Sequence, residues 1–392
     1  MTKVLFGGCV GWLSWRLEGC HVAQTHVPGR RDRLRKRADE AEEALVRRRL
    51  RDRSQQVRRT VQFAFLALNA WLAIEFLRWT HYFESQGQAR YVERPAGLDG
   101  WLPIAGLMNL KYFLVTHHSP AIHPAAMVLA VVFLLSSLLL KKTFCSWLCP
   151  VGTISEYLWK LGRKLFRRNV AVPRWLDIPL RSLKYVLMAF FLFIVVSMTA
   201  EALNEFMLAP FGIIADVKML NFFRNISITG MAVIGSLVVL SVFIQNFWCR
   251  FLCPYGALMG LVSTLSPVRI CRDAQACIDC GKCNKACPSS LPMDKLVQIR
   301  SLECTSCMEC VAVCPAENAL QFSLPPRRSV SETGAPAARW HNRALEPRLV
   351  AAVLALIFFG LIGVARATSH WQTNIPRDVY MRLVPHADEY GH

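Results

Sequence analysis

The chain has 392 residues, enough for two or three domains, and 53% of them are hydrophobic, with a mean hydropathy of +0.29. These values are high for a soluble protein and indicate membrane-spanning segments. The formal net charge of +19 does not indicate a nucleic-acid partner, because the basic residues lie beside apolar segments, where they fix membrane orientation.

Residues 1–59 form a basic segment that we expect on the cytoplasmic side. Its Arg-rich run from Arg30 to Arg59 favours a solvated helix near anionic lipid. The opening residues are hydrophobic but broken by glycines, so no signal peptide is expected. Cys9 and Cys20 fit no ligand pattern.

Five apolar stretches have about the length that a bilayer crossing requires. The first carries Asn69, Glu75 and Arg78, which would also suit an interfacial helix, but its aromatic residues and basic flank favour a span. The five predicted spans are Val61–Trp79, Pro124–Leu140, Leu183–Leu203, Ile226–Gln245 and Leu349–Ala365.

Basic residues gather between the second and third predicted spans, from Lys141 to Arg181, whereas the loops at 81–122 and 204–225 carry few. Basic loops stay on the cytoplasmic side of a bacterial inner membrane. Alternation then places the N-terminus and residues 265–325 in the cytoplasm and the tail at 366–392 in the periplasm.

A cysteine motif follows the second predicted span and recurs after the fourth, reading FCSWLCPVG at Phe144–Gly152 and WCRFLCPYG at Trp248–Gly256. The repeat predicts two parallel helix pairs related by a pseudo-twofold axis along the membrane normal. Cysteines four apart share a helix face, and the proline after each motif disfavours helical geometry at its second cysteine.

The four cysteines of these CxxxCP motifs could converge at the pseudo-axis. Three interpretations are open: a further metal or iron–sulfur site, a redox-active dithiol, or buried cysteines that recur because the halves were duplicated. The candidate residues are Cys145, Cys149, Cys249 and Cys253.

Residues 265–325 contain the spacing Cys-x2-Cys-x2-Cys-x3-Cys-Pro twice, beginning at Cys277 and at Cys304. This spacing is typical of two 4Fe-4S clusters in which the fourth cysteine of each motif ligates the other cluster. Zinc ribbons or disulfides do not explain it, and a reducing compartment suits cofactor thiolates. The predicted ligand sets are Cys277, Cys280, Cys283 and Cys314 for one cluster, and Cys304, Cys307, Cys310 and Cys287 for the other. Cys271 fits neither set and is interpreted as structural.

A linker at 326–348, rich in proline, arginine and serine, joins this module to the last predicted span at 349–365. Histidines lie at predicted outer segments, among them His81, His117, His118 and His123. We interpret them as interfacial polar residues in preference to a copper or quinol site. No predicted span has a histidine in its interior, which argues against a membrane haem.

With these motifs, the sequence resembles the membrane polyferredoxins of the NosR, NapH and CcoG type, most closely the membrane half of NosR. The resemblance covers about Val61 to Phe322 and rests also on Arg94–Ile104 (RPAGLDGWLPI) and Asp216–Met219 (DVKM). It implies an inner-membrane electron-transfer protein linked to periplasmic or copper-dependent respiration. The flavin-binding domain of NosR has no counterpart here, and neither covalent flavin nor copper reduction is carried over.

The expected fold is mainly α: a polytopic membrane domain at 60–264 and 349–365, with about five spans, and an inserted α+β dicluster ferredoxin-like module. The expected function is electron transfer between a cytoplasmic or quinol donor and a periplasmic redox protein or flavin-bearing subunit. Two alternatives stay open: an assembly or metal-reducing factor for a copper-dependent respiratory enzyme, and a redox-sensing membrane regulator.

Overall fold

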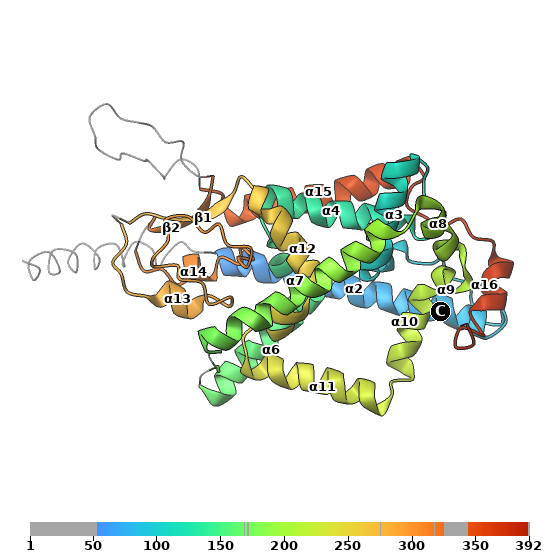
Figure 1. Ribbon diagram of the computed structural model, residues 1–392, viewed down its shortest axis with the longest axis horizontal. Helices are drawn as coiled ribbons and strands as arrows, with labels where there is room; N and C mark the ends of the chain where they lie inside the picture. The colour runs from blue at the N-terminus through green and yellow to red at the C-terminus, as the bar shows by residue number, and fades with distance from the viewer. Residues whose placement is uncertain are drawn as a thin grey trace, which may run out of the picture.

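The computed structural model describes residues 53–390, with gaps at 168, 171, 275, 317 and 325–343. The Arg-rich run up to residue 52, Cys9, Cys20 and most of the predicted linker fall outside this part of the chain. The described residues are mainly helical, as predicted, with one small sheet. The ferredoxin module lies at one end of an elongated bundle of helices (Figure 1).

Three helices are long and apolar enough to cross a membrane: α2 (Ser54–Glu84), α7 (Arg174–Ser197, apolar from Trp175) and α15 (Pro347–Ala367). The apolar helix α4 (Pro124–Leu140) has 17 residues, and α11 (Ile228–Phe243) meets α10 (Ala215–Arg224) at an angle of 85°, so that this pair could form a fourth, broken span. Each predicted apolar stretch is therefore helical. The number of five spans stays a prediction.

The boundaries differ from expectation at two places. The third predicted span, Leu183–Leu203, is interrupted because α7 ends at Ser197 and the Thr199 hydroxyl accepts a hydrogen bond from the Ala202 N–H at the start of α8 (Ala200–Leu208). The first predicted span extends at both ends into the 31-residue helix α2. Its polar residues do not shorten it, because neighbouring segments supply hydrogen-bond partners. Gln62 donates to Glu156 of α6, and Asn69 accepts from the Trp101 indole.

Short helices connect the long ones. Between α2 and α4 lie a 3-10 helix at Ala96–Trp101 and α3 (Pro103–Thr116), and α9 (Pro210–Ile213) precedes α10. The CxxxCP motifs occupy α5 (Thr143–Trp147) with the start of α6 (Pro150–Phe166), and a π-helical turn at Trp248–Leu252 with the start of α12 (Pro254–Val262). A 3-10 turn at Ser263–Leu265 and the tail helix α16 (Arg377–Leu383) complete the set.

Helix α4 forms the centre of the bundle and packs against α3, α12 and α15. It is apolar around its whole circumference, as expected of a helix that neighbours cover on all sides. Helices α7 and α11, in contrast, expose large apolar side chains along their length. Such faces suit lipid as the surrounding solvent.

The two halves make corresponding contacts. The helix after each CxxxCP motif packs on the apolar helix of the other half: α6 on α11, and α12 on α4. Likewise α2 contacts α5 and α6, while α7 contacts the π-helical turn and α12. These exchanged contacts are what a pseudo-twofold arrangement of two repeats requires, although the repeat symmetry itself stays a prediction.

The ferredoxin module is bounded by an antiparallel pair, β1 (Arg269–Arg272) and β2 (Leu320–Ser323), with Arg269 opposite Ser323 and Arg272 opposite Leu320. Two short helices, α13 (Lys282–Ala286) and α14 (Glu309–Ala312), lie between the strands in sequence. The rest of the module is loop, which leaves its cysteines on segments whose shape is set by turns. Cys271 is buried in β1, away from the cysteine loops, and its structural interpretation stays a prediction.

Buried ion pairs fasten this module to the bundle. The Arg58 guanidinium of α2 donates to both oxygens of Glu156 on α6, at 2.6 Å each, and to Glu309 of α14 at 3.0 Å. On the other half, Lys184 of α7 contacts Glu303 at 2.5 Å, and Tyr185 donates to the same carboxylate at 2.8 Å. Both long helices thus contribute one buried cation to the interface.

A second polar cluster lies at the far end of the bundle, opposite the ferredoxin module. Arg94 contacts Asp99 at 2.5 Å and Asp216 at 2.8 Å, and His123 Nδ1 lies 3.0 Å from Asp99. His123 is 0% exposed and its Nε2 lies 3.1 Å from the Gly212 carbonyl. Burial would raise the pKa of Asp99, but Arg94 and His123 lower it to about 2. The interpretation of His123 as an interfacial loop residue was therefore wrong, because its ring joins three segments at this end.

Replacing Arg58 with alanine should lower the stability of the protein by about 3 kcal/mol, because Glu156 and Glu309 would remain largely buried without their shared cation. The midpoint of thermal unfolding in detergent measures this loss. Burial would raise the pKa of Glu156, but Arg58 and Lys160 lower it from 4.5 to about 2, so the stabilisation is present above pH 4.5 and is lost as the pH falls toward 2.

The neighbouring exposed Arg59 provides the matched control, and Arg59→Ala should unfold at the wild-type temperature. Equal midpoints for the two alanine variants would contradict the proposed importance of the Arg58 ion pairs.

Candidate functional site

The first ferredoxin motif contributes Cys277, Cys280 and Cys283 at the exposed end of the module. Gly281, with φ of +66°, precedes α13 and turns the chain so that Cys283 enters the module interior. Burial raises the pKa of the Cys283 thiol, and the nearby thiols of Cys314, Cys277 and Cys280 raise it further. The structure therefore brings Cys314, from the second motif, to the cysteines of the first. We call these four residues the first ferredoxin site.

The second ferredoxin site consists of Cys287, Cys304, Cys307 and Cys310, which line one small cavity of about 10 Å³ together with apolar residues such as Ile270 and Met293. Burial raises the pKa of the Cys310 thiol well above its ordinary value, and the thiols of Cys307, Cys287 and Cys304 add to the effect. Cys287 thus lies with the second motif, as the exchanged-ligand spacing predicts.

The chemistry of both sites fits a cubane cluster. Each gathers four thiols, and the second surrounds an enclosed space with them. Burial and mutual proximity keep several of these thiols protonated unless a metal replaces the protons, since thiolate is the form that binds metal. Four thiols gathered at one point are the ligand set that a 4Fe-4S cluster requires.

The CxxxCP site lies where the bundle meets the ferredoxin module. Burial raises the pKa of the Cys249 thiol well above its ordinary value, with further contributions from the thiols of Cys253, Cys149 and Cys145. All four predicted cysteines therefore converge. Cys149 and Cys253 have extended backbones, with ψ of 120° and 105°, directly before a proline at the first position of the next helix, as predicted.

Close backbone packing fixes the geometry of this site. A Cβ at Gly152 would lie 2.1 Å from the Cys145 carbonyl oxygen, so only glycine fits at this position. In the second motif, the Gly256 N–H donates to the Cys253 sulfur at 3.2 Å. Gly152 therefore lets α6 approach the first pair of cysteines, whereas a Cβ at Gly256 would make only ordinary contact, 3.5 Å from the Cys253 sulfur.

Two buried lysines, Lys142 and Lys184, lie near these thiols. Lys142 belongs to the basic run that predicted membrane orientation, whereas no role was predicted for Lys184, which lies within the third predicted span. Burial raises the pKa of Cys145 to about 11, while Lys142 and Lys184 act in the opposite direction. The same lysines lower the pKa of Glu303. A pair of buried cations favours an anionic group, such as thiolates with bound iron, at the CxxxCP site.

Direct hydrogen bonds join the CxxxCP site to the second ferredoxin site. Ser146 donates to the Thr305 carbonyl at 2.6 Å, and the Trp147 indole donates to the Ser306 carbonyl at 3.3 Å. Both acceptors lie between Cys304 and Cys307, and both donors lie between Cys145 and Cys149. The role of Ser146 and Trp147 was not predicted, because hydrogen bonds over 159 residues of sequence leave no local pattern.

Within the described ranges, no three His, Cys, Asp or Glu side chains are arranged to hold a single metal ion. The ligands of a cubane cluster bind different irons and stand further apart than the ligands of one ion, so this finding does not bear on cluster binding.

Comparison with protein families gives two matches. A model described as a 4Fe-4S binding domain matches residues 122–169 and 226–270, which contain one CxxxCP motif each. A model described as a 4Fe-4S dicluster domain matches residues 269–315, which contain both ferredoxin motifs and end before β2. The first match shows that the two segments resemble one sequence family.

Several known proteins are similar to this chain. YccM of Escherichia coli, provisionally named an electron transport protein, is 50% identical over 86% of this chain and 91% of its own length. The ferredoxin-type protein NapH of Escherichia coli is 26% identical over 53% of this chain and 70% of its own. The regulatory protein NosR of Pseudomonas aeruginosa is 28% identical over 45% of this chain, but over only 24% of its own length. No solved structure matches.

Replacing Cys280 with serine should remove one cluster, about four irons per chain, because serine oxygen replaces a thiolate at the first ferredoxin site. Iron and sulfide analysis of anaerobically purified protein, with EPR of the reduced sample, measures the loss. Cys271→Ala is the matched control and should keep the full iron content. An unchanged iron count in Cys280→Ser would refute this ligand assignment.

Proposed function

From the premise that the chain belongs to the family of ferredoxin-type membrane proteins that includes YccM and NapH, we propose that it passes electrons between a cytoplasmic or quinol donor and a periplasmic respiratory partner. It is a multi-pass membrane protein that transfers electrons by means of 4Fe-4S clusters. The donor, the partner and the route are the proposed parts.

The first and second ferredoxin sites would hold one cluster each. When bound, each cluster supplies a one-electron redox couple. The protein's part is to hold four thiolates in place and to control solvent access. Cys280 is exposed, whereas Cys304 and Cys310 are buried, so the first site is the natural point of contact for a soluble donor.

The observation that carries the proposal is the pair of hydrogen bonds from Ser146 and Trp147 to the loop of the second ferredoxin site. They support a chain of three sites from exposed Cys280 to Cys149, because they join the CxxxCP site to the loop of the second ferredoxin site, whose motif also supplies Cys314 to the first. Trp147 is fully buried, so its indole excludes water from the contact. A chain of redox sites from a soluble face to a membrane needs such an arrangement.

At the CxxxCP site we favour ligands of a third cluster over a redox dithiol. Lys184 is balanced by Glu303, but the buried Lys142 supplies positive charge beside the thiols that a neutral dithiol would not need. The 4Fe-4S binding domain that matches both motif segments supports the same choice. An iron count of about twelve per chain agrees with three clusters, and about eight agrees with two clusters and a dithiol.

Replacing Cys149 and Cys253 together with serine should stop electron transfer through the protein and leave the EPR signals of both ferredoxin clusters intact, because the ferredoxin loops keep all eight of their cysteines. Reduced-minus-oxidised spectra and transfer to an added acceptor would be measured on the same membranes. Full activity of the double variant would exclude a relay role for the CxxxCP site.

We further propose that the protein lies in the bacterial inner membrane with the ferredoxin module in the cytoplasm and residues 366–390 in the periplasm. The basic residues of α6 and α7 on the ferredoxin side support this orientation. A periplasmic redox protein or a flavin-bearing subunit would then meet the far end of the bundle.

A cysteine introduced at exposed Glu389 should react with a membrane-impermeant maleimide in intact spheroplasts, whereas one at exposed Lys295 in the ferredoxin module should react only after lysis. Labelling of the Lys295→Cys variant before lysis would reverse the proposed orientation. The two variants serve as controls for each other.

A further inference from the structure

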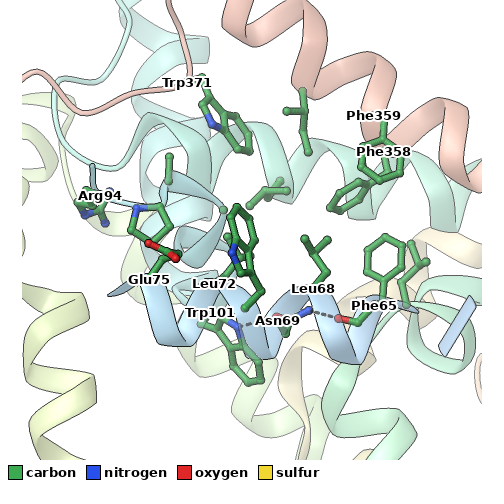
Figure 2. Close-up of a pocket in the computed structure, with 18 of the residues that line it drawn as sticks. Phe65, Leu68, Asn69, Leu72, Glu75, Arg94, Trp101, Phe358, Phe359 and Trp371 are labelled. Carbon is green, nitrogen blue, oxygen red and sulfur yellow. Dashed lines mark hydrogen bonds between the residues drawn. The ribbon is translucent and has the colours of Figure 1, made fainter. Parts of the chain in front are cut away.

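A cavity of about 500 Å³ lies between α2, α4 and α15, outside all three cysteine sites. Its size is within the range of small-molecule binding sites. Most of its lining is apolar or aromatic, and a few polar residues are gathered toward one end. Figure 2 shows Arg94 and Glu75 at that end, and Phe65, Phe358 and Phe359 at the other.

Polar groups lie within the predicted span of α2. Asn69 accepts a hydrogen bond from the Trp101 indole at 3.0 Å, and Glu75 lines the cavity about 1.7 turns further along the helix. Glu75 precedes Trp79, the end of the predicted span, by four residues, which corresponds to about 6 Å of helix. An ionisable residue within a span points to a functional site. Glu75 pairs with the exposed Arg78 at 3.0 Å, so its carboxylate has a charged partner toward the surface.

The opposite end of the cavity is built from the first CxxxCP motif. Phe144, Leu148 and Pro150 line it, and each is directly adjacent to Cys145 or Cys149 in the chain. The ring of Phe144 also stacks on Phe133 of α4 at 4.0 Å between centroids. The cavity therefore extends from Glu75 at its polar end to side chains that adjoin the cysteines of the CxxxCP site at the other end.

The cavity is accessible from the lipid-facing surface. Three of its lining aromatic residues, Trp71, Trp101 and Phe359, are also among the large side chains exposed on the outside of the bundle. If α2 and α15 span the bilayer, this opening faces hydrocarbon, and a ligand would enter from the membrane and not from water. The occupant must then be apolar with a small polar head.

We infer that this cavity binds an isoprenoid quinol, with its ring beside Asn69 and Glu75 and its tail toward the lipid. The inference rests on the proposed electron-transfer function and names its membrane substrate. The cavity is lined by two carboxylates, Glu75 and Glu93, and by two guanidinium groups, Arg94 and Arg366, so its lining carries no net charge that would attract a charged head group over a neutral one. A quinol hydroxyl, in contrast, can donate to a carboxylate.

The chemistry balances as follows. Oxidation of one quinol to the quinone breaks two O–H bonds and releases two protons and two electrons. The Glu75 carboxylate takes the first proton, and water at the far end of the bundle takes the second. The two electrons leave one at a time, and each reduces one oxidised 4Fe-4S cluster of this protein. The reverse sequence reduces quinone.

The test uses the full-length protein, purified anaerobically in detergent, with reduced decylubiquinone and a short-chain menaquinol as probes. The rate of cluster reduction is followed by absorbance and EPR. Glu75→Gln should slow reduction by quinol about 100-fold through the loss of a proton acceptor. Leu68→Trp, which fills the cavity, should abolish quinol-driven reduction. Dithionite should reduce the clusters of both variants as in the wild type.

Two substitutions outside the cavity serve as matched controls. Leu77→Trp adds the same bulk on the exposed side of α2, and Glu201→Gln removes an exposed carboxylate on α8. Both should react with quinol at the wild-type rate. The comparison separates filling of the cavity, or loss of its carboxylate, from a general effect on folding.

Quinol-driven reduction at the same rate in all variants would overturn the quinol site while leaving the electron-transfer function in place. Co-purification of phospholipid that Leu68→Trp displaces, without any reduction by quinol, would also overturn it and would identify a lipid site. Failure of dithionite to reduce any cluster in the wild type would instead refute the cluster assignment on which the proposed function depends.

Discussion

The contact between the ferredoxin module and the helix bundle depends on carboxylates that are buried and paired with cations. Arg58 from α2 and Lys184 from α7 each enter this interface with almost no solvent contact and meet Glu156, Glu309 and Glu303. Removing one partner of such a pair is costly because the other charge remains without water. The module is therefore held at one distance and one orientation, and the distance between cysteine sites is fixed by the same contacts.

This arrangement accounts for the hydrogen bonds of Ser146 and Trp147. A loop that carries cluster ligands has little regular structure of its own to hold it, since the described residues of the ferredoxin module form two short strands and two short helices. Its carbonyl groups at Thr305 and Ser306 are satisfied by donors from the CxxxCP motif. Each site thus completes the hydrogen bonding of the other, which a separate soluble ferredoxin could not achieve.

Charge is distributed differently at the two ends of the bundle. Near the ferredoxin module, buried lysines and arginines gather around cysteines whose thiolates carry negative charge when iron is bound. At the far end, Arg94 pairs with Asp99 and Asp216, and the buried His123 joins them in a closely packed cluster. Between the two ends, the wall of α2 contributes Asn69 and Glu75 to the cavity beside α15. The only titratable side chain that this stretch of α2 places in the cavity is thus near the far end, where a proton could reach water.

The sequence by itself determined the cofactor class and the helical nature of the protein. The cysteine spacings are local, and each CxxxCP motif carries its own proline and glycine, so the chemistry of these segments follows from a few adjacent residues. The apolar stretches could also be recognised in the sequence. The third one is interrupted, because α7 ends at Ser197 and Thr199 caps the start of α8. Only the tertiary structure decided which residues complete the sites. Lys142, Lys184, Trp147 and His123 are ordinary residues in sequence. Their roles arise from contacts between segments that are distant along the chain, such as Lys184 with Glu303, Trp147 with Ser306 and His123 with Gly212, for which no local periodicity exists. The cavity beside α2 is of the same kind, because its walls come from three helices that are distant along the chain and meet only when the bundle packs.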